Sequence, residues 1–433
     1  MSVTDSCGWI KLKGKWKQYP KFKNSQVADW VIIGAGFTGI AAARRIVELD
    51  PGKRVLLIDG KQPGQGASAR NSGFVVAYES SGHAQIHTKA GREGYIARHT
   101  IDRAGVAEVE KQITDYQIDC DWSRTGSIHA AADPKNFESI RRHHQGFSDL
   151  GIESSLLDHP QLESRLGTSH YGLGVYCEGG ALVQPAALVK GLLESLPEQV
   201  EVYAESPVLG IEPATGSKVR IKLAEAEVIA DRVIVAVNAF LPRLGLQANR
   251  VFPLALTASL TRRLNPDEML AMSGVEPWGI LSPQPLGATL RYTADNRLLI
   301  RNTAEFLPGI DPNQLQQRRN LHQAGLQKRF PWLGKDCIET SWSGQICVSR
   351  NSRPVFGELQ KNVFASGCYN ASGIAKGNIM GKLIAEYALG SSSELLDLTR
   401  SIATPAWIPP RWIFAPLARV RMASDRSKGL SET

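Results

Sequence analysis

The stretch DWVIIGAGFTG, residues 29–39, decides the fold predicted for this chain. Its apolar first half is typical of a buried parallel strand, and residues 40–49 continue with the apolar spacing of a helix. Gly34 permits a tight turn, Gly36 lets a phosphate approach the main chain, and Gly39 lets helix and strand pack closely. The stretch therefore predicts a βαβ unit whose helix N-terminus binds a pyrophosphate. The alternative is a glycine-bearing turn in another α/β fold.

A second apolar run, residues 54–58, ends at Asp59, where the second strand of such a unit would end. A carboxylate there accepts hydrogen bonds from a ribose hydroxyl and repels a 2′-phosphate. The glycines lie between two predicted strands, and the second strand ends at an acidic residue. A dinucleotide-binding site is therefore the favoured interpretation. NADP is disfavoured as its occupant.

Composition limits the class of protein. The chain has 433 residues, 42% of them hydrophobic, which is enough for two domains. It has no run of about 20 apolar residues and no secretory signal, so we expect a cytoplasmic protein. The six cysteines are scattered without a CxxC pair or a histidine cluster, which argues against a metal site and a disulfide framework.

The net charge of +8 is confined to the two ends. Residues 1–28 contribute +5 and residues 411–433 contribute +3, so the body of the chain is formally neutral. Solvated termini explain this pattern better than an acidic partner does, and no nucleic-acid partner is expected.

Both ends are expected to pack on the body. Alternation of lysines with apolar residues over 9–18 predicts an extended N-terminal arm. Residues 400–416, which are rich in proline and aromatic residues, predict an irregular C-terminal strap. In each case peripheral membrane contact is possible but not favoured.

Between the ends, the predicted elements alternate between two kinds of sheet. Residues 88–117, 135–149 and 313–329 are expected to be helices, 121–129 and 231–239 strands, and 252–301 a run of antiparallel strands. The sequence predicts the following units: an arm at 1–28, a cofactor-binding domain at 29–87, 180–250 and 350–400, a substrate domain at 88–179 and 251–349, and a strap at 401–433.

Three further motifs carry a resemblance to a known family. They are GASARNSG at residues 66–73, VAVNA at 235–239 and GCYNASG at 367–373, the last before a predicted helix. In this order they resemble the FAD-dependent D-amino-acid oxidase superfamily. WSG at 342–344 and NSRPVFG at 351–357 are most similar to its gamma-glutamylputrescine oxidase branch. The resemblance implies an α/β fold in which a Rossmann-like FAD-binding domain of the glutathione-reductase type is interleaved with an antiparallel-sheet substrate domain.

The resemblance also implies which residues bind FAD along its length, from adenine to flavin ring. They are Gly34, Gly36, Phe37, Thr38, Gly39, Asp59, Ser68, Arg70, Asn71, Ser72, Gly73, Val208, Ala236, Gly367, Asn370, Gly373 and Ile374. Binding is expected to be noncovalent, although relatives attach flavin through a cysteine in roughly the strand that holds Cys347.

The chemistry that the resemblance implies is oxidation of the CH–NH bond of an amine or amino acid by hydride transfer to flavin N5. Arg291, Tyr292 and Arg301 are candidates for anchoring a substrate carboxylate, since arginine grips that group with two hydrogen bonds. Ordinary charges at strand edges are the alternative for both arginines. Arg301 stands where many relatives have glycine, and Gln184 stands near a position where many have histidine.

The electron acceptor is O2 or another compound. A dehydrogenase that passes electrons to a quinone or carrier protein, and a flavoprotein that acts as a partner-binding or RNA-modification module, both stay open.

Overall fold

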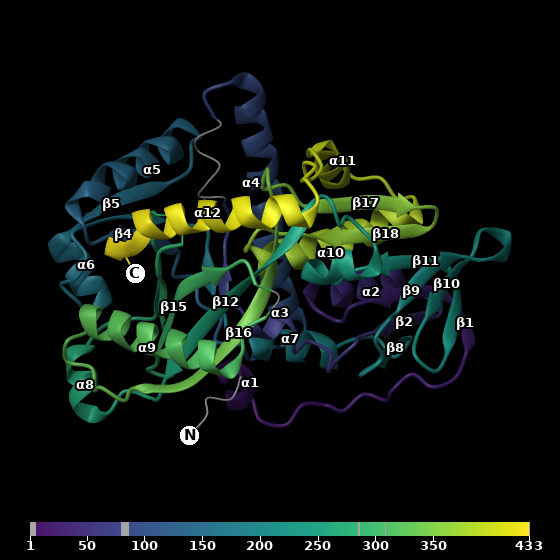
Figure 1. Ribbon diagram of the computed structural model, residues 1–433, viewed down its shortest axis with the longest axis horizontal. Coiled ribbons are helices and arrows are strands. Elements are labelled where there is room, and N and C mark those ends of the chain that lie inside the picture. Colours follow the sequence, from purple (N-terminus) through teal and green to yellow (C-terminus); the bar gives the residue numbers. More distant parts are fainter. Residues whose placement is uncertain (1–5, 79–85, 285, 308, 433) are drawn as a thin grey trace.

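The computed structural model describes residues 6–78, 86–284, 286–307 and 309–432. Two large sheets organise it, one to the right and one to the left in Figure 1. A short ladder of β3 (Phe74–Val75) and β7 (Ala181–Leu182) is separate from both. This arrangement confirms the predicted α/β class.

The first sheet contains the predicted βαβ unit. Strand β1 pairs in parallel with β2 on one side and β11 on the other, and the order is β17-β18-β11-β1-β2-β8, with β10 and β9 beyond β11. The strands are β1 (Gln26–Ile33), β2 (Val55–Ile58), β8 (Val200–Tyr203), β9 (Gly210–Pro213), β10 (Val219–Lys222), β11 (Glu227–Val235), β17 (Val355–Gln360) and β18 (Val363–Gly367). Trp30 to Ile33 of β1 are all buried, as a strand covered on both faces requires.

Four helices accompany this sheet. They are α2 (Phe37–Leu49), α4 (Lys89–Asp115), α7 (Pro185–Glu194) and α10 (Gly373–Leu389). Helix α10 packs on both α2 and α4. Gly381 makes the α2 contact possible, because a Cβ there would lie 2.3 Å from the carbonyl oxygen of Thr38.

The second sheet has the order β16-β12-β15-β14-β13-β4-β6-β5. Its strands are β4 (Ser127–Ala131), β5 (Ser154–Asp158), β6 (Leu173–Cys177), β12 (Val251–Thr261), β13 (Trp278–Leu281), β14 (Thr289–Tyr292), β15 (Leu298–Glu305) and β16 (Ile338–Ser349). Neighbours are antiparallel except β13 and β4, which pair in parallel where the two chain segments of this sheet meet. The strand predicted at 121–129 begins only at Ser127.

Helices α5 (Phe137–Asp149), α6 (His159–Leu166), α8 (Pro266–Ala271) and α9 (Pro312–Arg329) accompany the second sheet. Strands of each sheet come from the chain segments predicted for each domain, while the domain boundaries themselves stay a prediction.

The prediction for the N-terminal arm was wrong at its start. Residues Gly8–Leu12 form a short helix, α1, and the less exposed residues that follow recur every three positions, not every two. Trp9 explains the difference: it is 1% exposed, and its indole N–H donates to the Asn71 carbonyl at 2.9 Å. Burial of this one side chain fixes the segment against the body.

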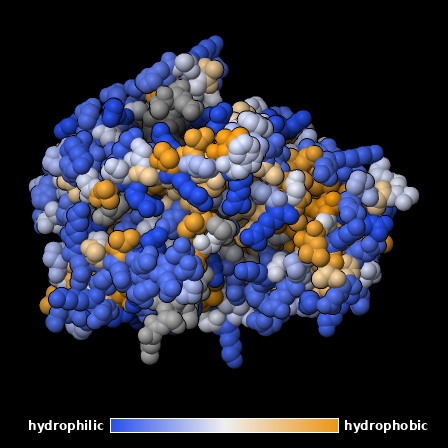
Figure 2. All heavy atoms as spheres, in the orientation of Figure 1, coloured by the Kyte–Doolittle hydropathy of each residue, from blue (hydrophilic) through white to orange (hydrophobic). Residues whose placement is uncertain are grey.

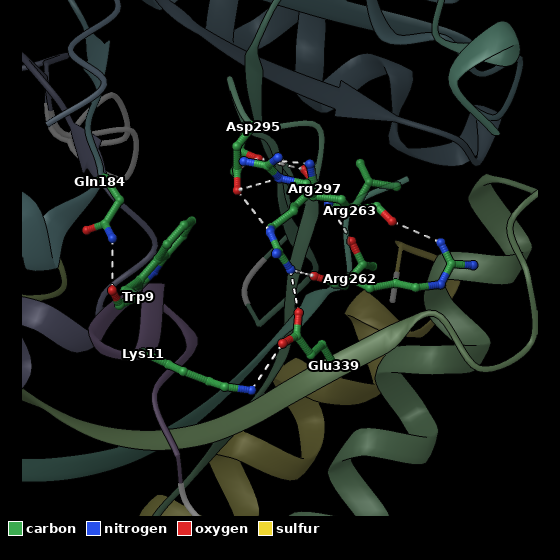
Figure 3. A network of polar contacts seen from close by, with 11 residues as sticks. Trp9, Lys11, Gln184, Arg262, Arg263, Asp295, Arg297 and Glu339 are labelled. Carbon is green, nitrogen blue, oxygen red and sulfur yellow. Dashed lines mark hydrogen bonds and ion pairs between the residues drawn. The ribbon is translucent and has the colours of Figure 1, made fainter. Parts of the chain in front are cut away.

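Polar contacts hold the same helix to the second sheet (Figure 3). Lys11 pairs with Glu339 at 3.1 Å, and Glu339 in turn accepts from Arg297 at 2.6 Å. On the other side Gln184 donates to the Trp9 carbonyl at 2.9 Å. Helix α1 therefore joins elements that are far apart in the sequence.

The irregular structure expected at 400–416 is present over residues 402–410, whereas residues 411–416 already belong to a helix. After α11 (Glu394–Ser401), helix α12 (Arg411–Gly429) crosses the front of the molecule in Figure 1. Most prolines of the segment precede the helix, and Pro410 is its N-cap, so only Pro416 lies inside.

Both ends of α12 are anchored to the second sheet and its surroundings. Phe414 packs on Phe252, with ring centroids 4.7 Å apart, and the buried Glu432 accepts from the Ala132 N–H at 3.0 Å. Between the anchors Trp412 and Leu417 are exposed, and Figure 2 shows hydrophobic and hydrophilic residues side by side along the helix. Across the described ranges, none of the helices is long and apolar enough to span a bilayer.

Candidate active site

Three glycines shape the turn between β1 and α2. Gly34 has φ +101°, which disfavours other residues, and a Cβ there would lie 2.7 Å from the Ala236 carbonyl oxygen. A Cβ on Gly39 would lie only 1.8 Å from the Gly34 oxygen. Gly34 and Gly39 are thus each required by a close backbone approach.

The N-terminus of α2 is open to an anion. Its N-cap residue, Gly36, has no side chain to satisfy the first N–H groups, and the Phe37 N–H donates to Ser68 Oγ at 3.0 Å. Uncapped N–H groups and the positive end of the helix dipole together attract phosphate. A Cβ on Gly36 would come within 2.6 Å of the Ser68 hydroxyl.

Asp59 lies directly beside this turn. Its carboxylate accepts from the N–H of Ala35 at 2.9 Å and from that of Lys61 at 2.8 Å, which orients it, and burial raises its pKa. A carboxylate has about four acceptor positions, so two remain for a ribose. Ala236 is buried beside Gly34, and partly exposed Val208 follows the segment whose Ser206 N–H binds the Asp59 carbonyl.

The loop after α3 (Ala67–Arg70) is held by its own polar groups. The Asn71 side chain donates to the Ser68 carbonyl at 2.7 Å and accepts from the Gly73 N–H at 2.8 Å. Arg70 donates to the Ser343 carbonyl at 3.0 Å. Gly73 has φ +81°, and a Cβ would meet the Val183 oxygen at 2.2 Å. The loop is therefore rigidly attached to β16.

The turn before α10 has an unusual backbone. Cys368, Asn370 and Ala371 all have positive φ, between 50° and 77°. The Asn370 side chain supports the turn, since it accepts from the Ser349 N–H and donates to the Cys368 carbonyl, both at 3.0 Å. Positive φ at three non-glycine residues within four positions is typical of functional sites.

This turn aims the N-terminus of α10. Ser372, its N-cap, makes no side-chain cap hydrogen bond, so the N–H groups at Gly373 and Ile374 are available. Gly367, at the end of β18, passes within van der Waals reach of Asn238, where a Cβ would lie 3.2 Å from its Cα.

A cavity of about 410 Å³ lies between these loops and the second sheet. Its lining joins the loop after α3, the first turn of α10 and strands β12, β14, β15 and β16. Of the predicted FAD-binding residues, those in the lining are Arg70, Asn71, Ser72, Asn370, Gly373 and Ile374. The residues of the β1–α2 turn lie outside the lining, joined to it through Ser68.

Of the three residues predicted to bind a carboxylate, only Arg301 lines the cavity. It donates to Thr289 Oγ1 on the neighbouring strand, and burial alone lowers its pKa, to about 10. It is therefore a cation at neutral pH with a neutral partner. Among the described lining residues none is acidic.

Arg291 and Tyr292 lie elsewhere. Arg291 is 2% exposed, donates to the carbonyls of Val183 and Ser72, and stacks over Trp9 at 5.3 Å. Tyr292 lies in the core of the second sheet, where its hydroxyl donates to Asn296 at 2.7 Å. Neither residue is in the described lining of the cavity, and their printed contacts are with the protein.

Cys347 also lies away from the cavity. It is 1% exposed and packs with Val355 and Cys368, and the hydrogen bond with the Cys368 side chain, together with burial, raises its pKa. Gly344, Gln345 and Ile346, which precede it on β16, line the cavity, whereas Cys347 is not in the lining.

Sequence reasoning gave no role to several lining residues. Lys376 lies in the first turn of α10 and pairs with the buried Asp102 of α4 at 3.5 Å. Tyr78 and His129 line another part of the wall. The one signal in the sequence was Lys376, a lysine among apolar and small residues at the start of a predicted helix, where a charged side chain is unusual. His129 stood at the end of a predicted strand and gave none.

These residues fit an extended dinucleotide. Two helix N-termini without a side-chain cap match the needs of its phosphates and flavin ring, and a carboxylate beside the first of them has acceptor positions for a ribose.

Comparison with known proteins agrees with this geometry. The family model described as "FAD dependent oxidoreductase" (DAO) matches residues 29–387. Gamma-glutamylputrescine oxidoreductase of Escherichia coli is 28% identical over 386 residues, which cover 87% of each chain. A probable oxidoreductase, OrdL, of Haemophilus influenzae is 25% identical over 90% of this chain and 89% of its own.

Solved structures show the same fold. Glycine oxidase from Geobacillus kaustophilus superposes with a TM-score of 0.69 at 20% identity, over 85% of this chain and 96% of that one. L-amino acid deaminase from Proteus myxofaciens gives 0.70 at 14% identity, over 91% and 96%.

Proposed function

We propose, from the premise that the chain belongs to the DAO family of FAD-dependent oxidoreductases, that it oxidises the CH–NH bond of an amine that carries a carboxylate. The relative named gamma-glutamylputrescine oxidoreductase and the fold shared with glycine oxidase support an amine or amino acid as the substrate.

The chain's own groups would hold the cofactor at four points. The N-terminus of α2 binds the pyrophosphate, Asp59 binds the adenosine ribose, and the loop at Asn71 and Ser72 lies near the flavin ring. The N-terminus of α10 offers positive potential to the ring edge that gains electrons. FAD, when bound, accepts a hydride from the carbon that bears the amine, and the imine so formed is hydrolysed by water to a carbonyl compound and ammonia or an amine.

Arg301 is the observation that carries the proposal. It is a cation in the cavity wall whose hydrogen-bond partner is the neutral Thr289, and burial without a nearby carboxylate lowers its pKa to about 10. Arg301 is half-buried, and a charge partly withdrawn from water normally has a counter-charge. We infer that the substrate's carboxylate supplies it and is held there while the amine faces the first turn of α10.

FAD binding is proposed to be noncovalent. The buried position of Cys347, with Ile346 and not Cys347 in the cavity wall, supports this.

An anaerobic screen tests the proposed function. Purified holoenzyme is mixed with amines and amino acids, with and without a carboxylate, and flavin absorbance is followed. We expect bleaching by carboxylate-bearing amines and none by the matching amine esters. Failure of every amine to bleach the flavin would overturn the proposal.

The same mixture separates the possible electron acceptors. Rapid reoxidation by O2 identifies an oxidase, whereas slow reoxidation that a soluble quinone analogue accelerates identifies a dehydrogenase.

A further inference from the structure

Helix α12 has two sides, and an apolar one faces away from the body of the protein. The partly buried residues, which mark the inner side, are Phe414, Ala415, Ala418, Met422 and Asp425. The exposed residues on the opposite side include Trp412, Ile413, Pro416, Leu417 and Val420. At about 3.6 residues per turn, these last five lie within one half of the helix surface. We call them the outer stripe.

The outer stripe is open to solvent although its residues are apolar. Trp412 is 77% exposed, Val420 70% and Leu417 62%. The helix that carries them crosses the front of the molecule (Figure 1). Contiguous apolar side chains on a protein surface normally mark a binding face.

Contacts on the inner side hold the helix in this orientation. Phe414 packs on Phe252 and Phe306, with ring centroids 4.7 and 5.8 Å away. Arg426 donates to the Ala304 carbonyl at 3.2 Å. A rotation of α12 that buried the outer stripe would break these contacts, so the stripe stays outside.

Basic residues flank the outer stripe along both edges. By the helical repeat, Arg419 and Arg426 lie along one edge, and Arg421 and Lys428 along the other. The one acidic residue of the helix, Asp425, is on the inner side and pairs with Arg421 at 3.0 Å. The exposed side of α12 therefore combines an apolar centre with a cationic rim.

An anionic lipid surface matches this arrangement. Apolar side chains enter the boundary between headgroups and acyl chains, where tryptophan is favoured, and arginines at the edges meet negatively charged headgroups. A second copy of the chain matches it less well. A two-fold symmetric contact through the outer stripe would place the same basic edge of each copy opposite itself.

We propose that α12 docks the protein on an anionic membrane surface, with the outer stripe in the headgroup region and the helix axis parallel to the bilayer. This inference goes beyond the proposed function and does not depend on the substrate. The sequence did not favour membrane contact here, because an irregular strap has no continuous face. The helix creates that face.

Vesicle flotation of the holoenzyme tests the proposal. Vesicles of phosphatidylcholine with about one quarter phosphatidylglycerol are compared with vesicles of phosphatidylcholine alone. We expect the holoenzyme to float with the anionic vesicles and to partition at least ~10-fold more weakly onto the neutral ones, because each basic residue near an anionic surface adds attraction. Raising the salt from about 0.1 M to 1 M should weaken binding by screening. Absence of the protein from the anionic vesicle fraction at low salt would overturn the proposal.

Leu417→Gln combined with Val420→Gln removes apolar contact and leaves the charge unchanged. We expect this double variant to partition at least ~10-fold more weakly onto anionic vesicles, since two apolar side chains no longer leave water. Leu270→Gln combined with Leu321→Gln is the matched control, because these leucines are 76% and 50% exposed on α8 and α9. It should bind as the wild type does. Equal binding by the two double variants contradicts a role for the outer stripe.

Quenching of tryptophan fluorescence by brominated lipid then identifies the part of the chain that meets the vesicle. Trp412→Phe keeps an apolar ring, so this variant should still float but lose most of the quenching. Unchanged quenching would show that another segment enters the lipid, which overturns the proposal.

Sedimentation of the wild type without lipid tests the second copy as the occupant. We expect the Leu417→Gln, Val420→Gln variant to keep the wild-type oligomeric state. A wild type that fails to float, and whose oligomers dissociate in this variant, would assign the outer stripe to a contact between copies.

Discussion

The two sheets contribute to the site in different ways. Around the first sheet the site is formed mainly by main-chain groups. Gly34 and Gly39 permit close contact between backbone segments, and the N-termini of α2 and α10, which have no side-chain cap, present N–H groups. Around the second, side chains such as Arg301 are brought together by strand pairing. The first part is therefore sensitive to any added side chain, and the second to the loss of particular ones.

The largest effect is expected from adding a side chain in the first part. Gly36→Val places methyl groups where a Cβ alone would already be 2.6 Å from Ser68 Oγ and where the pyrophosphate must lie. We expect the folded protein to be purified without FAD, measured by absorbance near the flavin bands. Gly52→Ala, where a Cβ meets only Asp50 at 3.9 Å, is the control and should stay yellow. Full FAD occupancy in folded Gly36→Val would contradict the assignment.

The second-largest effect is expected at the junction between the parts of the site formed around the two sheets. Trp9 is buried between the Asn71 loop, Arg291 and Trp342, so Trp9→Ala leaves a large cavity there. Truncating a buried tryptophan costs about 3–5 kcal/mol, and we expect a clear fall in the midpoint of urea denaturation. Trp412→Ala, at a residue 77% exposed, should change the midpoint little. Similar midpoints for the two variants would show that α1 is not part of the stable fold.

A smaller effect is expected from removing a side chain in the second part. Arg301→Ala should lower kcat/KM for a carboxylate-bearing amine at least ~10-fold, about 1.4 kcal/mol, because a charge-assisted hydrogen bond is lost. FAD content should not change. Arg263→Ala, at an arginine with a 70% exposed side chain, should leave kcat/KM unaltered.

Arg291→Ala sharpens the same comparison. Since Arg291 is not in the described cavity lining and donates to the carbonyls of Val183 and Ser72, it should affect thermal stability more than substrate selection. If kcat/KM falls in this variant and not in Arg301→Ala, the carboxylate is bound by Arg291. If neither arginine matters, the substrate is not anionic at that end.

The same difference explains what the sequence could predict. The β1–α2 turn and Asp59 are local in sequence, and their backbone requirements appear as a glycine motif. His129 joins the cavity only through the pairing of β4 with β13, two strands that are about 150 residues apart in the chain and that pair in parallel. No local pattern encodes that register.

The predictions for the two terminal segments were partly wrong for a related reason. Alternating lysines predicted an extended arm, but burial of Trp9 outweighs the local pattern and α1 is helical. At the other end the irregular structure predicted for 400–416 holds over 402–410, but α12 begins directly after Pro410, its N-cap, and continues through Pro416. In both places tertiary contacts or exact position overrode composition.

The smallest effect is expected at β16, where the two parts of the site meet, and it concerns which side chains of this strand face the cavity. Ile346 faces the cavity, while Cys347 points to the core of the first sheet beside Val355 and Cys368. A thiol buried there cannot reach a flavin ring in the cavity without reversing the strand. A hydrogen bond with the Cys368 side chain, together with burial, raises the pKa of Cys347, which disfavours the reactive thiolate. We therefore expect acid precipitation to release all yellow colour into the supernatant, and Cys347→Ala to purify with wild-type FAD content. Colour that stays with the pellet in wild type and moves to the supernatant in Cys347→Ala would show that this strand turns its other face to the cofactor.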